Sequence, residues 1–162
     1  MARVYVGLGS NLDRESRLRE ALGLLRLNFG DIEMSPVYDS AAVGFDGSNF
    51  LNLVVCFDSL LEVEEVVRVF REIENQLGRD RSLPKFASRS IDLDILLYGD
   101  RIVDVPGIRI PRPEILVNAF VLKPLQDIAA QRLHPETGQS YADLWQAMAP
   151  NAPQLDLFSL EF

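Results

Sequence analysis

Residues 89–99 read RSIDLDILLYG, and this stretch has the clearest strand pattern in the chain. Apolar and acidic residues alternate in its first half, and successive side chains of a strand point to opposite faces of a sheet. We therefore expect a strand from Ser90 to Tyr98 with two distinct faces. One face would carry Ile91, Leu93, Ile95 and Leu97, and the other Asp92, Asp94, Leu96 and Tyr98. The two acidic residues would then point the same way, roughly 6.5 Å apart along the strand.

On the N-terminal side of this stretch the pattern predicts three further strands and two helices. The strands are expected at residues 3–8, 32–38 and about 50–57. Apolar residues at helical spacing predict helices from the region of Leu18 to Phe29 and from Val63 to Leu77. Asp13 is expected to cap the first helix, and Gly78 to end the second. The order β-α-β-β-α-β is typical of ferredoxin-like α+β folds, in which helices pack on an antiparallel sheet.

The C-terminal third is predicted to add smaller elements to this βαββαβ core. A short hairpin is expected to run from Gly99 to Ile110, followed by helices near residues 119–130 and 141–148. A chain of 162 residues favours one domain with a sizeable core, so we expect a single domain over residues 1–162.

Charge and composition exclude several classes of protein. The net charge is −8, which argues against a nucleic-acid partner because nucleic-acid binding needs a basic face. No segment is long and apolar enough for a membrane span, and the strand-like N-terminus does not resemble a signal peptide. Cys56 has no second cysteine to pair with, which is typical of a reducing compartment. We expect a cytoplasmic protein with no membrane contact and no obligate protein partner.

A basic segment lies immediately before the acidic strand. Between residues 79 and 89, Arg79, Arg81, Lys85 and Arg89 stand against a single acid, Asp80. A basic island in an acidic chain suggests a localised site for an anion. An exposed loop with solvated charges explains the same pattern, and composition alone does not separate the two interpretations.

The acidic pair suggests metal-assisted chemistry. Mg²⁺ prefers one or two carboxylates together with water and substrate phosphates, so Asp92 and Asp94 suit one or two such ions. Arg89 precedes Asp92 by three residues and could hold a phosphate beside the metal. Phosphoryl transfer is therefore one hypothesis, and a solvated polar strand face is the other.

Three further features carry weaker signals. Residues 7–11, Gly-Leu-Gly-Ser-Asn, lack the ending of a P-loop and the third glycine of a dinucleotide motif, so we expect a tight strand-to-helix turn. Phe50 and Asn52 would share a strand face, where a ring and an amide suit a flat heterocycle, although half-buried strand residues often look the same. Spacing alone makes Glu74 an acid on a helix surface.

Taken together, these residues resemble the hydroxymethyldihydropterin pyrophosphokinase family from about residue 4 to residue 125. The matching motifs are Gly9-Ser10-Asn11-Leu12, Phe50-Leu51-Asn52, Ile73-Glu74 with Gly78-Arg79, the stretch at 89–99, and Ala119-Phe120-Val121-Leu122 with Pro124-Leu125. The stretch at 89–99 is the most specific, because it reproduces the family's Arg-x-x-Asp-hydrophobic-Asp signature. Order and spacing agree across all five motifs.

The resemblance implies an ATP-dependent diphosphotransferase of folate biosynthesis. Such enzymes transfer diphosphate from ATP to the hydroxymethyl group of a reduced pterin and release AMP. By position, the resemblance implies two Mg²⁺ ions on Asp92 and Asp94, with Arg79, Arg81 and Arg89 acting with them in catalysis. It implies ATP binding by Glu74, Arg79, Arg81 and Arg89. We add Arg112 as a hypothesis, because its guanidinium could grip a phosphate and replace part of the charge that a family Arg would supply at Asn118. It implies pterin binding by Ser40, Ala41, Val43, Phe50, Asn52 and Phe120.

The chain departs from the family pattern at several of these positions. Arg112 stands where His is usual, Asn118 replaces an Arg, Phe86 replaces a Trp, and Ser40-Ala41 replace a frequent Thr-Pro. The metal pair and both ring positions are intact. Two alternatives follow: a paralogue that acts on a different pterin alcohol, and a pterin- or nucleotide-binding module without catalysis.

Overall fold

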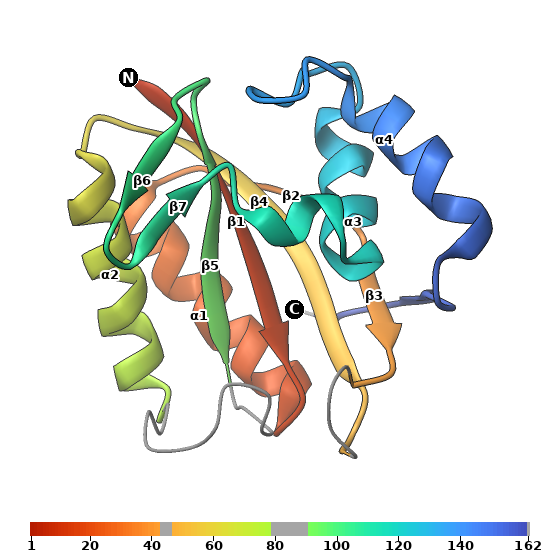
Figure 1. The fold of residues 1–162 in the computed structure, drawn as a ribbon. Helices are drawn as coiled ribbons and strands as arrows, with labels where there is room; N and C mark the ends of the chain where they lie inside the picture. Colours follow the sequence, from red (N-terminus) through yellow and green to blue (C-terminus); the bar gives the residue numbers. More distant parts are fainter. Residues whose placement is uncertain (43–46, 79–90, 162) are drawn as a thin grey trace.

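A computed structural model describes residues 1–42, 47–78 and 91–161, and these form an α+β domain around one antiparallel sheet (Figure 1). Strand β1 (Ala2–Ser10) lies in the sheet interior, between β4 (Phe50–Ser59) and β5 (Asp92–Tyr98). Strand β3 (Val37–Ser40) pairs with the other edge of β4, and the sheet order is β5-β1-β4-β3-β8. The ferredoxin-like fold prediction is confirmed.

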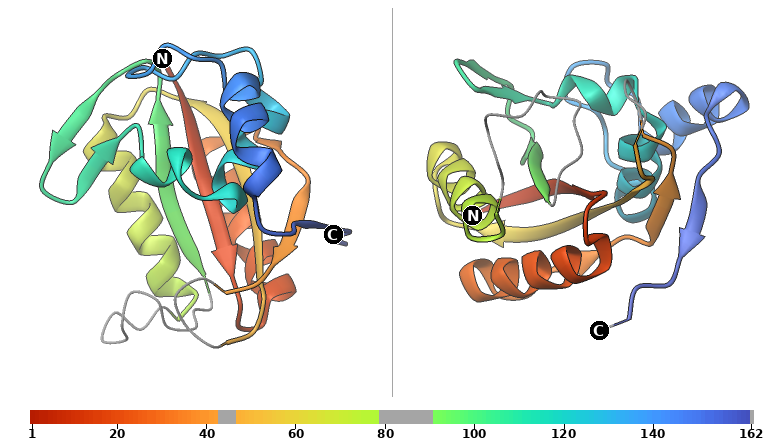
Figure 2. Two further views of the ribbon diagram at one scale, coloured as in Figure 1. Left: turned by 45° about the vertical axis from the view of Figure 1, so that its right-hand side comes forward. Right: turned by 90° about the horizontal axis from the view of Figure 1, so that it is seen from below.

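Two helices cover one face of the sheet. Helix α1 (Arg14–Phe29) and helix α2 (Val63–Gln76) lie on the same side, as the view from below in Figure 2 shows. Their apolar stripes meet the inward residues of the strands in one buried cluster, which includes Val6, Leu8, Leu22 and Phe70. Burial of this apolar surface is the main force that holds helices and sheet together.

Helices from the C-terminal third of the chain lie on the opposite face of the sheet. Helix α3 (Ala119–Ala129) packs on β4, and helix α4 (Tyr141–Met148) packs on α3 (Figure 2). These helices form a second buried cluster with outward residues of the strands, among them Tyr5, Val54 and Leu96. The short 3₁₀ helix η1 (Pro113–Leu116) connects α3 to the β6–β7 hairpin (Val103–Val105 and Ile108–Ile110). Helix α3 therefore stands over the face that the α1–α2 layer leaves free.

The remaining elements refine the predicted order. The expected strand at 32–38 is split at Ser35-Pro36 into β2 (Glu33–Met34) and β3, where Pro36 has no N–H to donate to the sheet. Strand β8 (Asp156–Phe158), after the 3₁₀ helix η2 (Ala149–Asn151), pairs with β3 and was not predicted, since three largely exposed residues carry little pattern. Asp13 precedes α1 as expected, but its side chain makes no capping hydrogen bond.

One predicted strand face is wrong in its second half. The register of β5 against β1 shifts between Tyr5 and Val6, so that Leu96 and Leu97 both belong to the cluster under α3. Tyr98 consequently packs in the α1–α2 cluster, and its hydroxyl donates to the carbonyl of Leu61 at 2.6 Å. A bulge of this kind adds one residue and reverses the alternation beyond it. Asp92 and Asp94 precede the bulge and keep the predicted common face.

Within the described residues, no helix combines the length and apolar character needed to cross a membrane.

Candidate active site

The candidate site lies on the sheet face opposite α1 and α2, where three strands bring distant parts of the sequence into one row. Gly9 of β1 is paired with Asn52 of β4 on one side and with Asp92 of β5 on the other. Residues paired across antiparallel strands point to the same face, and neighbouring strands lie about 4.8 Å apart. The amide of Asn52 and the first acid of the pair therefore flank Gly9, with backbones roughly 10 Å apart.

The two glycines at the start of the chain do not form the expected turn. Gly7 and Gly9 lie inside β1, and neither has a positive φ. The chain turns later, at Asp13, which takes a left-handed conformation with φ of 48°. The prediction of a Gly-based strand-to-helix turn is therefore wrong, and Gly9 instead leaves space on the sheet surface between Asn52 and Asp92.

The acidic pair is partly enclosed and electrostatically strained. The side chain of Asp94 is 26% exposed. Burial, followed by the neighbouring Asp92 carboxylate, raises the pKa of Asp94 to about 7. Two carboxylates held side by side in this way form a site suited to a divalent cation. Within the described residues, no group of three or more His, Cys, Asp or Glu gathers that could hold a metal ion.

Helix α2 holds the main chain between the two acids. Among the strands of the described residues, β5 lies at the sheet edge, and none of them pairs with Leu93 on its outer side. The Glu74 carboxylate accepts from the Leu93 N–H at 2.8 Å, and Arg71 donates to the Leu93 carbonyl at 3.2 Å. Arg71 and Glu74 also pair with each other at 2.6 Å. These contacts of Arg71 and Glu74, called the clasp below, hold Leu93, the residue between Asp92 and Asp94 in the strand.

The position of Glu74 differs from that of a helix-surface acid. Its side chain is fully buried, because α2 turns this residue toward β5 rather than toward solvent. The surface interpretation is corrected by this burial. Its carboxylate is committed to the Leu93 N–H and to the Arg71 guanidinium.

Arg112 lies beside the acidic pair. Its guanidinium is 3.5 Å from Asp94 and also pairs with Glu114, while its main-chain N–H donates to the Leu96 carbonyl at 3.0 Å. The side chain is 26% exposed, so it is accessible to a ligand above the sheet. The Arg112 cation favours the charged form of Asp94, so it offsets part of the rise in the pKa of that carboxyl, which stays raised overall.

At the β3–β4 end of this row, two buried oxygen atoms lie without partners among the described residues. Within the described segments, neither the Ser40 hydroxyl nor Asn52 Oδ1 has a hydrogen-bond partner. Ser40 pairs with Phe50 across β3 and β4, so these atoms gather on the same sheet face as the Phe50 ring. Unpaired buried polar atoms cost free energy, and a ligand with complementary donors would remove that cost.

Phe120 lies in the first turn of α3, the helix that packs on β4 and β3. The helix is tied to β3 because the Tyr38 hydroxyl donates to Asp127, whose carboxylate also pairs with Lys123 at 2.7 Å. Tyr38 is itself the cross-strand partner of Asn52. Sequence reasoning missed this link, since Tyr38 and Asp127 are 89 residues apart and no local pattern connects them.

The predicted site residues thus fall into two groups. Ser40, Ala41, Phe50, Asn52, Glu74, Asp92, Asp94, Arg112 and Phe120 belong to the described part of the chain, whereas Val43, Arg79, Arg81 and Arg89 lie outside it. Phe50, Asn52 and Phe120 are half-buried, and Ala41 is exposed. Sequence reasoning also missed Arg71, although its spacing of three residues before Glu74 is that of a helical ion pair.

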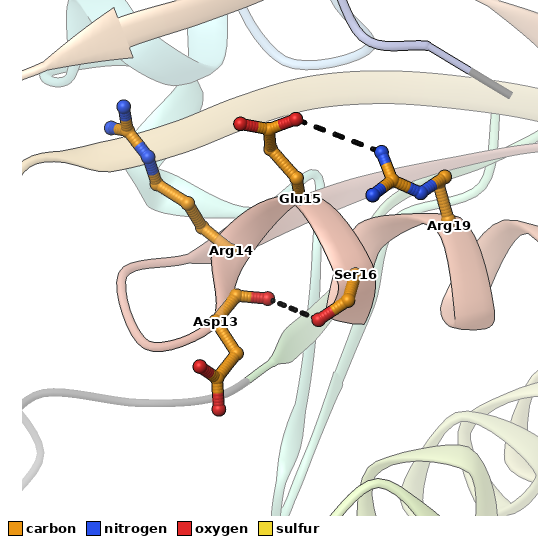
Figure 3. A pocket seen from close by; sticks show the side chains of 5 residues that line it. All are labelled: Asp13, Arg14, Glu15, Ser16 and Arg19. Atoms are coloured by element: carbon orange, nitrogen blue, oxygen red, sulfur yellow. Dashed lines mark hydrogen bonds and ion pairs between the residues drawn. The ribbon is translucent and has the colours of Figure 1, made fainter.

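A separate hollow lies at the first turn of α1 and contains none of the predicted site residues (Figure 3). Its lining is Asp13, Arg14, Glu15, Ser16 and Arg19. Both of its arginines are already paired, since Arg19 lies 3.7 Å from Glu15 and Arg14 lies 3.0 Å from Asp39. The hollow is a surface feature of the helix start.

A small α+β domain of ferredoxin-like fold thus carries an acidic pair, an amide and an aromatic side chain along one face of its sheet. The sequence profile described as 7,8-dihydro-6-hydroxymethylpterin-pyrophosphokinase (HPPK) matches residues 5–130. The chain belongs to this family.

Individual relatives agree with this assignment. The 2-amino-4-hydroxy-6-hydroxymethyldihydropteridine pyrophosphokinase of Aquifex aeolicus is 38% identical over 138 residues, which cover 83% of this chain and 85% of the relative. The protein of the same name from Bacillus subtilis is 34% identical over 150 residues, covering 88% and 89%.

Solved structures support the fold. The wild-type HPPK-DHPS of Plasmodium falciparum superposes with a TM-score of 0.73 at 14% identity, over 92% of this chain. The present chain spans only 45% of that longer protein. At such low identity the likeness concerns the fold alone.

Proposed function

We propose that the protein transfers diphosphate from ATP to the hydroxymethyl group of a 6-hydroxymethyl-dihydropterin, yielding AMP and the pterin diphosphate for folate biosynthesis. The observation that carries this proposal is the row across the sheet, in which the Asn52 amide and the Asp92 carboxylate flank Gly9. Family membership supplies the reaction class. In the transfer the pterin oxygen bonds to the β-phosphorus of ATP, the bond from that phosphorus to the α,β-bridging oxygen breaks, and the hydroxyl proton passes to solvent.

Asp92 and Asp94 would hold two Mg²⁺ ions together with the phosphates. The residues present fit this role, because two adjacent carboxylates share one face and the pKa of Asp94 is raised by burial and by Asp92. When bound, such ions neutralise phosphate charge and orient the reacting oxygens. Leu93, held by Arg71 and Glu74, keeps both carboxylates at the end of the row where the phosphates would lie.

Basic residues would complete the phosphate site. Arg79, Arg81, Arg89 and Arg112 are proposed to bind the ATP phosphates, since phosphoryl transfer relies on charge neutralisation and in-line positioning. Arg112 supports this role by its position 3.5 Å from Asp94. Glu74 is proposed to serve ATP binding as a positioning residue, through Leu93.

The pterin would occupy the other end of the row. Phe50 and Phe120 are proposed to stack on the two faces of its ring, while Asn52 and the segment of Ser40, Ala41 and Val43 recognise its edge. The unpartnered Asn52 oxygen and Ser40 hydroxyl support this assignment, because a pterin edge presents N–H donors to such acceptors. The reaction needs no nucleic acid and no protein partner. We place it in the cytoplasm, where a free thiol such as that of Cys56 stays reduced.

One assay tests the proposal. The protein is incubated with ATP, Mg²⁺ and 6-hydroxymethyl-dihydropterin, and the AMP and pterin diphosphate formed are quantified. The two products are expected in equal amounts. Pterin alcohols with other side chains serve as competitors, compared by kcat/KM. No AMP above the level of an Asp92→Asn/Asp94→Asn variant would overturn the proposal in favour of a binding module. A higher kcat/KM for another pterin alcohol would reassign the substrate.

A further inference from the structure

Gly9 occupies a position where glycine is not needed for the backbone. It lies in the interior of β1, hydrogen-bonded between β4 and β5, and its φ is not positive. A glycine inside a strand weakens it by roughly 0.5–1 kcal/mol relative to alanine, because more chain entropy is lost on folding. The benefit of glycine at this position must therefore come from the missing side chain.

The space beside Gly9 is filled by the amide of Asn52. A Cβ atom on Gly9 would lie 2.7 Å from Asn52 Nδ2, closer than non-bonded atoms approach, and 3.8 Å from the Phe50 ring. The Asn52 Nδ2 reaches over β1 toward the Leu8 carbonyl, at 3.4 Å. The other end of the same amide, Oδ1, is buried without a hydrogen-bond partner among the described residues.

Gly7 provides an internal comparison. It lies two residues earlier on the same strand and the same face, and its added Cβ would meet Leu96 at 3.5 Å, an ordinary contact. The two glycines therefore differ sharply in what an alanine would meet. An alanine at Gly9 would force the Asn52 amide to move, whereas an alanine at Gly7 would fit beside Leu96.

We infer that Gly9 is a positioning residue for pterin recognition: its missing side chain lets the Asn52 amide lie across β1, with its oxygen presented to an N–H group of the heterocycle. The inference rests on the proposed function and deepens it. An alanine at residue 9 would turn the amide away and leave the ring edge without its acceptor. The metal–phosphate end of the row, on Asp92 and Asp94, would keep its own ligands.

The test compares four variants with the wild type: Gly9→Ala, Gly7→Ala, Asn52→Ala and the double variant Gly9→Ala/Asn52→Ala. Pterin affinity is measured by calorimetry with a non-hydrolysable ATP analogue and Mg²⁺ present, and the affinity of that analogue is measured without pterin. Gly9→Ala should weaken pterin binding at least tenfold and leave analogue binding within about twofold. Gly7→Ala should leave both constants within about twofold.

The double variant distinguishes an effect of Gly9→Ala through the Asn52 amide from a general disturbance of the strand. If the methyl group acts through Asn52, then Gly9→Ala should cause no further loss of pterin affinity once Asn52 is alanine. Equal pterin binding by Gly9→Ala and Gly7→Ala would overturn the inference, as would fully additive losses. If Gly9→Ala alone fails to fold, recovery of folding in the double variant supports the steric contact, and failure to recover overturns it. A wild type that binds no pterin at all would instead remove the proposed function.

Discussion

The Glu74 carboxylate and the main-chain N–H of Leu93 are joined by a hydrogen bond of 2.8 Å, and this bond anchors the edge strand that carries the acidic pair. Arg71 completes the clasp by donating to both Glu74 and the Leu93 carbonyl. Helix α2 therefore supplies the hydrogen bonds that a further strand would otherwise provide. The orientation of Asp92 and Asp94 depends on this contact between strand β5 and helix α2.

Glu74→Ala is expected to destabilise the fold and the site together. The change leaves the buried Leu93 N–H and the Arg71 guanidinium without this partner, a loss of about 1–3 kcal/mol in the free energy of unfolding. Urea unfolding measures it, and Glu72→Ala, which removes an exposed acid from the same helix, is the control. Equal unfolding midpoints for the two variants would contradict the clasp.

Asp92→Asn and Asp94→Asn are each expected to lower kcat/KM at least a hundredfold while the protein stays folded. Each change withdraws a ligand that stabilises developing phosphate charge, an effect of several kcal/mol. Steady-state AMP formation measures kcat/KM, and circular dichroism shows whether each variant is folded. The control is Asp58→Asn, which changes an exposed acid of β4 paired with Arg3 at 3.5 Å. Turnover within a few-fold of the wild type would remove the metal assignment.

Arg112→Ala is expected to lower kcat/KM for ATP by about an order of magnitude. A charge-assisted phosphate contact contributes roughly 1.5–3 kcal/mol, and Arg112 is placed to replace the charge that is missing at Asn118. Adding Asn118→Arg to this variant should restore part of the loss. Arg109→Ala, which breaks an exposed pair with Glu136, should leave the ATP kinetics unchanged. Unchanged kinetics in Arg112→Ala itself would make this residue a structural partner of Asp94 only.

His134 is expected to make the fold sensitive to mild acid. The ring is 1% exposed, and its Nδ1 accepts hydrogen bonds from the N–H groups of Glu136 at 3.1 Å and Thr137 at 3.2 Å. Burial lowers the pKa of His134, so the folded state binds this proton less readily than the unfolded chain. The stability that neutral His134 gives the folded state is complete above the ordinary pKa of about 6.5, and it is lost progressively as the pH falls below that value.

The measurement is the free energy of unfolding of the wild type minus that of His134→Asn, between pH 8 and pH 5. Asparagine keeps an acceptor near Nδ1 but does not titrate, and carboxylates shared by both proteins cancel in the difference. The difference should shrink as the pH falls. Parallel stability curves for the two proteins would show that folding leaves the pKa of His134 unchanged and would contradict the prediction.

Local pattern was sufficient for much of this molecule. The helices at 63–76, 119–129 and 141–148 match the expected segments closely, because apolar spacing follows directly from helix geometry. The bulge at Leu96 was not predictable, since Leu96 and Leu97 are both apolar and alternation cannot show which of them is the extra residue. The missed β8 and the split of β2 from β3 have a related cause, as short strands carry too few residues for a period.

The sequence by itself determined that Asp92 and Asp94 share a face and that Phe50 and Asn52 share a face, because a period of two residues is a property of any strand. Only the tertiary structure decided that these two faces are the same one, that Gly9 lies between them, and that Glu74 is buried against Leu93. Each of these relations depends on register between segments that are tens of residues apart. Register is selected by burial of the whole core and by complete hydrogen bonding of the sheet, which no local stretch of sequence contains.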